Sequence, residues 1–143
     1  MINLEQVSMG WSFVKHRENI AHLRDDDIII AMASVQKLAA RDPATPPRVA
    51  KMLSSWPSDG LEAPSGCIVV PLDNTLADDG DREWLASALQ TVAEQFEANP
   101  DLASLESLTL LVGPDAGFIR GRDHEELAYV CRRICGVIAQ ASP

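Results

Sequence analysis

Three stretches of the chain repeat apolar residues at helical spacing, and they predict its main helices. The first begins at Asp25-Asp26-Asp27 and stops at Arg41-Asp42-Pro43, the second covers about residues 81–98, and the third begins at Asp123. Acidic residues in the first turns complement the unpaired amide groups of a helix N-terminus. We therefore interpret the three consecutive aspartates as helix-capping residues rather than as ligands of a metal ion.

Two further segments of the N-terminal half are also predicted to be helical. Thr45 and the two prolines after it form a helix start in which the threonine accepts a backbone hydrogen bond. The first 24 residues show two patterns: Leu4, Val7, Trp11 and Val14 follow helical spacing, whereas Met9, Trp11 and Phe13 alternate as in a strand. We expect a helix there.

Two apolar runs favour strands. The run at 67–70 is rich in β-branched residues and lies between a glycine and a proline, and the run at 108–112 is a second candidate. Turn residues at 113–117 would let residues 118–120 return as a third strand. A right-handed β-α-β crossover through residues 67–112 is then expected.

These elements predict a mixed, helix-rich α+β fold with four or five helices packed on a small sheet of two or three short strands. A length of 143 residues suits one domain. Within this single domain, residues 1–143, we expect a helical N-terminal half, 1–60, and a mixed strand and helix half, 66–143.

Composition narrows the class of protein. Hydrophobic residues make up 46% and charged residues 23% of the chain, as in globular proteins rather than disordered ones. The sequence has no apolar span of about 18 residues, and its start lacks the basic region and apolar run typical of a signal peptide, so we expect a cytoplasmic protein without membrane contact. Three cysteines cannot all pair within one chain, and we expect them to be reduced.

Negative charge is concentrated in the middle of the chain. The net charge is -9, and residues 59–106 hold eleven acidic residues against one basic residue, Arg82. Such a surface steers basic partners, whereas nucleic acids require clustered lysines and arginines. We therefore expect a basic protein partner and no nucleic acid. The predicted partner-binding residues are Asp78, Asp79, Asp81 and Glu83.

The run Pro71-Leu72-Asp73-Asn74-Thr75-Leu76 follows the first apolar run. It resembles the first motif of haloacid-dehalogenase-like phosphatases, in which an apolar strand precedes Asp-x-Asp-x-Thr. In that family the first aspartate is the nucleophile and the second handles the proton of the leaving group. Here Pro71 stands in the first place, and proline cannot form the covalent intermediate. No lysine follows Lys51 either, so we interpret the likeness as structural and Asp73 as a turn residue.

Other candidate chemistry has a simpler structural interpretation. Cys131 and Cys135 lie four residues apart on the last helix, as two zinc ligands would. A zinc site needs two further ligands, for which Cys67 and His124 are the candidates. Buried cysteines commonly pack as small hydrophobic residues, so we predict core packing, no metal and no cofactor. The glycines and arginines of residues 113–122 are interpreted as a hairpin turn, with anion binding as the alternative.

The sequence leaves three hypotheses for function. The first is a non-enzymatic acidic protein that binds a basic protein partner, in the manner of an inhibitor, an immunity protein or a secretion chaperone. The second is a structural or oligomeric subunit, including a homodimer. The third is an enzyme of unrecognised type with a degenerate phosphatase-like motif, in which Asp73, His124 or Cys67 would take part.

Overall fold

The fold is seen in a computed structural model that describes residues 11–16, 18–54, 69–71, 78–113 and 120–139. These residues form a three-stranded sheet, five α-helices and one 3-10 helix, which confirms the predicted helix-rich α+β class. In chain order the elements are β1 (Trp11–His16), β2 (Asn19–Arg24), α2 (Asp25–Ala39), α3 (Pro47–Ser54), β3 (Val69–Pro71), α5 (Asp79–Ala98), η1 (Pro100–Ala103), α6 (Leu105–Val112) and α7 (His124–Ala139).

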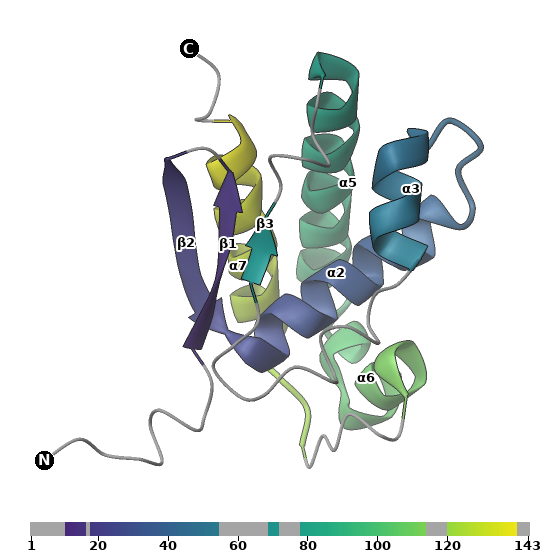
Figure 1. Ribbon diagram of the computed structural model, residues 1–143. Helices are drawn as coiled ribbons and strands as arrows, with labels where there is room; N and C mark the ends of the chain where they lie inside the picture. The colour runs from purple at the N-terminus through teal and green to yellow at the C-terminus, as the bar shows by residue number, and fades with distance from the viewer. Residues whose placement is uncertain (1–10, 17, 55–68, 72–77, 114–119, 140–143) are drawn as a thin grey trace, which may run out of the picture.

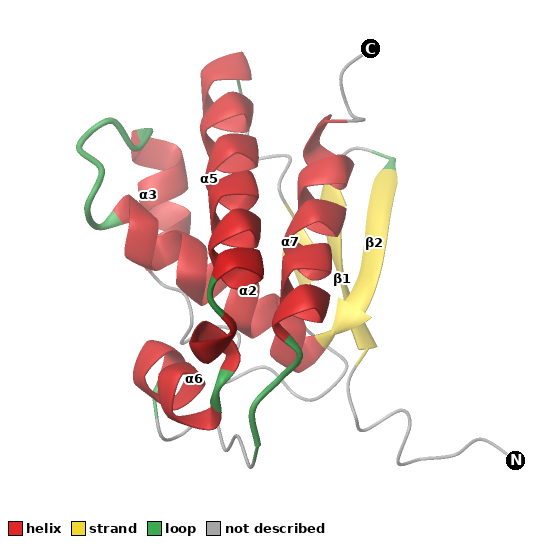
Figure 2. Ribbon diagram, turned by 180° about the vertical axis from the view of Figure 1, so that it is seen from behind, coloured by secondary structure: helices red, strands yellow, loops and turns green. Residues whose placement is uncertain are grey.

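The sheet has the order β2-β1-β3. β1 and β2 form an antiparallel hairpin in which Trp11 is paired with Arg24, and β3 is parallel to β1 with Phe13 opposite Val69. Figure 1 shows α7 behind this sheet, and the reverse view in Figure 2 shows α7 lying across it beside α5. The two helices run in opposite directions, and α2 crosses near their lower ends in Figure 1.

The core lies where α2, α5 and α7 bring their apolar faces together. Leucine, isoleucine and phenylalanine side chains at helical spacing are almost entirely buried there, which removes about 25 cal/mol of unfavourable hydration per Å² of apolar surface. The buried residues include Ile28, Met32 and Val35 of α2, Leu85, Leu89, Val92 and Phe96 of α5, and Leu127, Cys131, Ile134 and Ile138 of α7. The apolar spacing read from the sequence therefore identifies these buried faces correctly.

The helix expected in the first 24 residues is wrong, because the described part of this segment is the β1–β2 hairpin. Burial alternates along the hairpin: Val14, Ala21 and Leu23 are buried, whereas Lys15 and His22 are exposed. A period of two places every second side chain against α7, and this packing decided between the two patterns that the sequence contained. The N-terminal half is accordingly not helical throughout.

The strand expected at 108–112 is also wrong, and so is the β-α-β crossover that depended on it. This run belongs to the helix α6, which begins where the Ser104 hydroxyl accepts a hydrogen bond from the Ser107 amide and ends at Gly113, whose φ is 111°. A short apolar run does not distinguish a strand from a buried helix, whereas the cap residue does. Of the third expected strand, Phe118 and the residue after it lie outside the described residues, and Arg120 is not in a strand.

The other predicted helices are confirmed as α2, α3, α5 and α7. The Thr45 hydroxyl has a different task from the predicted one, because it donates to the Ala39 and Asp42 carbonyls at the end of α2 instead of accepting a bond from α3. Within the described ranges, no helix is long and apolar enough to cross a membrane.

Candidate functional site

The predicted partner-binding residues surround the start of α5. The Asp78 carboxylate accepts a hydrogen bond from the Asp81 amide at 2.9 Å and so caps the helix. Asp78, Asp79 and Glu83 are exposed, and Asp79 forms an ion pair with Arg82. Asp81 is only 6% exposed, so the prediction that it contacts a partner at the surface does not fit its position. We call Asp78, Asp79 and Glu83 the N-terminal acidic group.

The remaining acidic residues of α5 lie at its other end. Asp79, Glu83, Glu94 and Glu97 are all exposed and share one face of the helix, because their spacing follows the helical repeat. At 1.5 Å per residue, Glu83 and Glu94 are separated along the helix axis by roughly 16 Å, which exceeds the screening length of about 8 Å at physiological salt. The exposed acidic residues of α5 therefore form two separate groups along the helix.

The second acidic group of α5 lies next to α7. Together with residues of α7 it forms a surface that we call the Tyr129 face. Its residues are Glu94 and Glu97 of α5 and His124, Glu125, Tyr129 and Arg132 of α7. All of them except Glu94 line a shallow hollow of about 360 Å³. Tyr129 is 60% exposed, an unusual position for a large aromatic side chain in a helix whose opposite face is buried.

Hydrogen bonds fix two side chains of the Tyr129 face. The Arg132 guanidinium donates two hydrogen bonds to the Glu97 carboxylate, at 2.6 and 2.7 Å. This contact lowers the pKa of Glu97 and raises that of Arg132. The Nδ1 of His124 lies 2.8 Å from the Phe96 carbonyl oxygen, which can only accept, so Nδ1 carries the proton. Glu94 and Glu125 take part in no ion pair among the residues that the structure describes.

A buried carboxylate joins α2 to the start of α7. Asp27 is 2% exposed, and its Oδ1 lies 2.6 Å from Nη2 of Arg122, which also lies 3.6 Å from Glu126. Burial raises the pKa of Asp27 to about 6 despite the attraction of Arg122. The capping interpretation is therefore wrong for this residue: α2 starts after Arg24 without a side-chain cap, and Asp27 points inward.

A raised carboxyl pKa is common in catalytic sites, but Asp27 lines neither the hollow of the Tyr129 face nor the pocket between α2, α5 and α6. Its surroundings are those of a structural ion pair, in which a buried arginine compensates a buried carboxylate. We therefore interpret Asp27 as part of the packing between α2 and the start of α7.

The two cysteines within the described residues, Cys131 and Cys135, confirm the interpretation that they pack in the core. Cys131 is fully buried, and burial raises the pKa of its thiol to about 12. Cys135 is partly buried, with its Sγ 3.6 Å from the Ala86 carbonyl oxygen. No three His, Cys, Asp or Glu side chains in the described segments are arranged to hold a metal ion. Cys67 and Asp73 lie outside the described residues, and Pro71 of the phosphatase-like run ends β3.

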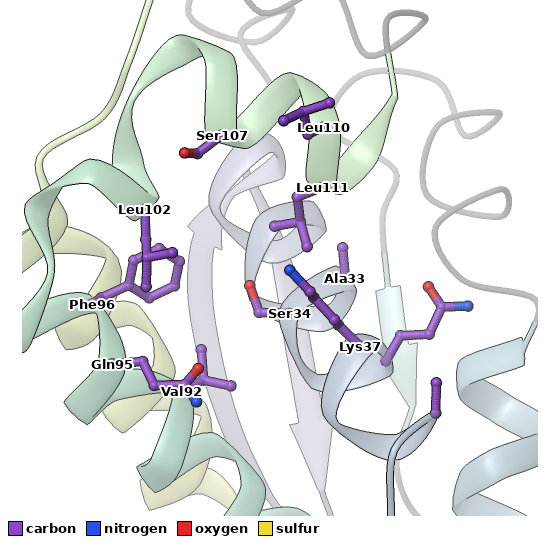
Figure 3. A pocket seen from close by; sticks show the side chains of 12 residues that line it. Ala33, Ser34, Lys37, Val92, Gln95, Phe96, Leu102, Ser107, Leu110 and Leu111 are labelled. Carbon is purple, nitrogen blue, oxygen red and sulfur yellow. The ribbon is translucent and has the colours of Figure 1, made fainter.

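A larger pocket, of about 530 Å³, lies between α2, α5 and α6. Figure 3 shows Val92 and Phe96 of α5 on one side, Ala33 and Lys37 of α2 on another, and Leu111 of α6 above them. Its walls are mainly apolar, and among the described residues that line it Lys37 alone is charged. We call it the α2–α6 pocket.

Sequence reasoning missed both Tyr129 and the α2–α6 pocket. The sequence does contain a sign of Tyr129. It lies between the buried positions Ala128 and Val130 but is not part of the apolar stripe of α7, and the packing of the helix does not need an aromatic residue there. The pocket had none, because it depends on α6, whose apolar run resembles a strand.

No protein-family model matches the chain, and no curated protein or solved structure matches it. The function must therefore be argued from the geometry of these sites.

Proposed function

We propose that this protein is a non-enzymatic binding protein that engages a basic protein partner, in the manner of a small inhibitor, an immunity protein or a secretion chaperone. We place the contact at the Tyr129 face. The observation that supports this proposal is the exposed Tyr129 ring beside the carboxylates of Glu97 and Glu125.

The chemistry of the Tyr129 face suits a partner that presents arginine or lysine. Tyrosine is enriched among the residues that dominate binding energy at interfaces, because it buries a large rigid surface at a small cost in entropy. Its ring also attracts a cation within about 6 Å of its centroid. Glu94 and Glu125 are exposed and available to a cation of the partner, while Arg132 holds Glu97 in place.

The N-terminal acidic group is the second candidate for the same function. Its charges already act within the protein, since Asp78 caps α5 and Asp79 is paired with Arg82. The aromatic residue next to it in α5, Trp84, is partly buried and donates its indole N–H to Asp42, so the group would steer a basic partner without anchoring it.

The location of the contact can be tested by NMR with a short oligo-arginine peptide as the probe. We expect the amide shifts that respond to the peptide to centre on Glu97, Glu125 and Tyr129, and we expect Tyr129→Ala to weaken binding by roughly tenfold, as an interface hot spot does. The control is Glu83→Gln, which changes the N-terminal acidic group and should leave the affinity within about twofold. Shifts that centre on Asp78 and Glu83 would place the contact at the other end of α5.

The partner itself can be sought by affinity capture from a native lysate. The wild-type protein should retain a basic protein at low salt and release it at high salt, because complementary charges are screened. The Tyr129→Ala variant should retain much less of the same protein. Capture that is equal for both proteins, or the absence of any basic protein at low salt, would contradict the proposal. A molar mass that rises with concentration would instead support the homodimer.

A further inference from the structure

The α2–α6 pocket has the dimensions of a site for a small molecule. Such sites enclose about 300–1,000 Å³, and this pocket has a volume of about 530 Å³. It is formed by three helices that also supply the core, so its walls are positioned by the same packing that holds the fold together. It shares no lining residue with the Tyr129 face.

The walls of the pocket are mainly aliphatic. Val92 and Phe96 are 1% and 3% exposed, and Leu102 and Leu111 are partly buried against the core. Leu110 also lines the pocket, and it is 80% exposed. A leucine in this position exposes apolar surface to water, and an apolar ligand in the pocket would cover that surface.

One positive charge lies in this aliphatic lining. Lys37 is exposed, forms no ion pair with any described residue, and is not accompanied by a carboxylate in the lining. Figure 3 shows its amine directed toward the middle of the ring of lining residues, near Ser34 and Leu111. The Ser34 hydroxyl donates to the Ile30 carbonyl at 2.8 Å, so toward a ligand its oxygen can only accept. Gln36, Gln95 and Ser107 also carry hydrogen-bond donors in the lining, and Lys37 is the donor that bears a charge.

We propose that the α2–α6 pocket binds a linear aliphatic carboxylate, with the carboxylate paired to Lys37 and the alkyl chain against Val92, Phe96 and Leu111. A single lysine matches a single negative charge, and no arginine, whose planar fork suits phosphate, is among the described residues of the lining. Six alanine, valine and leucine side chains against one aromatic ring favour an alkyl chain over a planar ring system. The pocket is independent of the proposed protein contact.

Calorimetric titration with decanoate tests the proposal on the intact protein. We expect saturable binding of one decanoate per chain, and we expect the affinity to rise by up to about fourfold for each methylene between hexanoate and decanoate, because each becomes buried. The chemical controls have the same chain length: decan-1-ol should bind more weakly, and decylammonium should bind weakest because it faces Lys37. Failure to see saturable decanoate binding, or equal binding of decylammonium, would overturn the proposal.

Variants locate the site. Lys37→Met keeps the alkyl stem and should weaken decanoate binding by roughly threefold to tenfold while leaving decan-1-ol unchanged. The matched control is Lys15→Met, which removes an exposed lysine on β1, outside the pocket, and should leave decanoate binding unchanged. Ser107→Phe should fill the pocket and abolish binding, and Leu110→Asp, at an exposed position, should abolish it without disturbing the core. Circular dichroism checks that each variant is folded. Decanoate affinity that survives Lys37→Met and Leu110→Asp in folded protein would show that the site lies elsewhere.

Discussion

Two arginine–carboxylate pairs in this molecule have the same closest distance and opposite surroundings. The Asp27–Arg122 pair and the Glu97–Arg132 pair each have an N–O separation of 2.6 Å. The side chains of the first pair are 3% and 14% exposed, and those of the second are 48% and 38% exposed. The contacts differ as well: Arg132 donates two hydrogen bonds to the Glu97 carboxylate, whereas Arg122 approaches Asp27 through one N–O contact, and the buried Oδ1 of Asp27 has no hydrogen-bond partner among the described residues.

The two carboxylates shift their pKa values in opposite directions. The hydrogen bonds from Arg132 stabilise the charged form of Glu97 and lower its pKa. Desolvation acts in the opposite direction, but its effect is smaller because the pair is exposed to water. Loss of solvation raises the pKa of Asp27 to about 6, although Arg122 attracts its charge. For a buried ion pair, the cost of removing the charges from water thus outweighs their attraction.

The pairs also differ in how their arginines are held. The Arg122 amide donates to the Ala103 carbonyl at 2.8 Å, so the backbone that precedes α7 is fixed against η1. Gly121 makes this approach possible, since a Cβ there would lie 2.7 Å from the same carbonyl oxygen. Arg132 projects from the surface of α7 and is held through its side chain. The buried pair is consequently part of the fold, and the exposed pair is part of the binding surface.

The sharpest test of this contrast is to remove the buried arginine. Arg122→Met leaves the Asp27 carboxylate buried without its cation, and at pH 8 we expect a loss of roughly 3 kcal/mol in the free energy of unfolding. The loss should shrink at pH 5, where Asp27 can be protonated. Urea denaturation measures both values, with Arg133→Met, at an exposed position of α7, as the control. A loss under about 1 kcal/mol at pH 8 would mean that the Asp27–Arg122 pair does not hold α2 to the start of α7.

The pH dependence of stability reports on Asp27 directly. Its folded pKa, about 6, is above its unfolded value of 3.8, so its contribution to stability is fully present below pH 3.8 and is lost as the pH rises through about 6. The shift corresponds to roughly 2–3 kcal/mol.

We therefore expect the difference in unfolding free energy between the wild type and Asp27→Asn to decrease by that amount from pH 4 to pH 7. The control is Asp26→Asn, on the exposed neighbouring position of α2, for which no comparable change is expected. A difference that is constant across this range, or that grows with pH, would contradict the raised pKa.

The backbone contact beside Arg122 should be nearly as sensitive. Gly121→Ala places a methyl group against the Ala103 carbonyl, and we expect a loss of roughly 1–3 kcal/mol as the segment moves. Gly136→Ala is the matched control, because a Cβ there meets no atom within 4 Å and the residue lies inside α7. It should stabilise the protein by about 0.5–1 kcal/mol, as alanine does in a helix. Thermal unfolding of the two variants should therefore move in opposite directions.

The smallest effect is expected from the exposed pair. Glu97→Gln and Arg132→Met, alone and together, form a double-mutant cycle whose coupling in unfolding experiments should be small and should vanish at high salt. The same substitutions should change binding of an oligo-arginine peptide, since Glu97 belongs to the Tyr129 face. A coupling that persists at high salt would show that this pair also stabilises the fold.

Much of the helical architecture was readable from the sequence. The buried stripes of α2, α5 and α7 follow from apolar spacing, and their ends follow from proline and acidic residues, because these signals act within a few residues of the chain. The β1–β2 hairpin and α6 were misread. Trp11 fits both the helical and the strand pattern of the first 24 residues, and the run of α6 fits both a strand and a helix, so local preference could not decide between them.

The sites depended on neighbours that are distant in the chain. The sequence by itself determined that the protein is acidic, rich in amphipathic helices and without a recognisable catalytic motif. Only the tertiary structure decided that Asp27 turns inward to Arg122, that Asp81 is buried, and that Tyr129 stands exposed beside Glu97. The physical reason is that burial and charge pairing are set by which helix faces meet. That choice is made by the packing of the whole core, and no single segment encodes it.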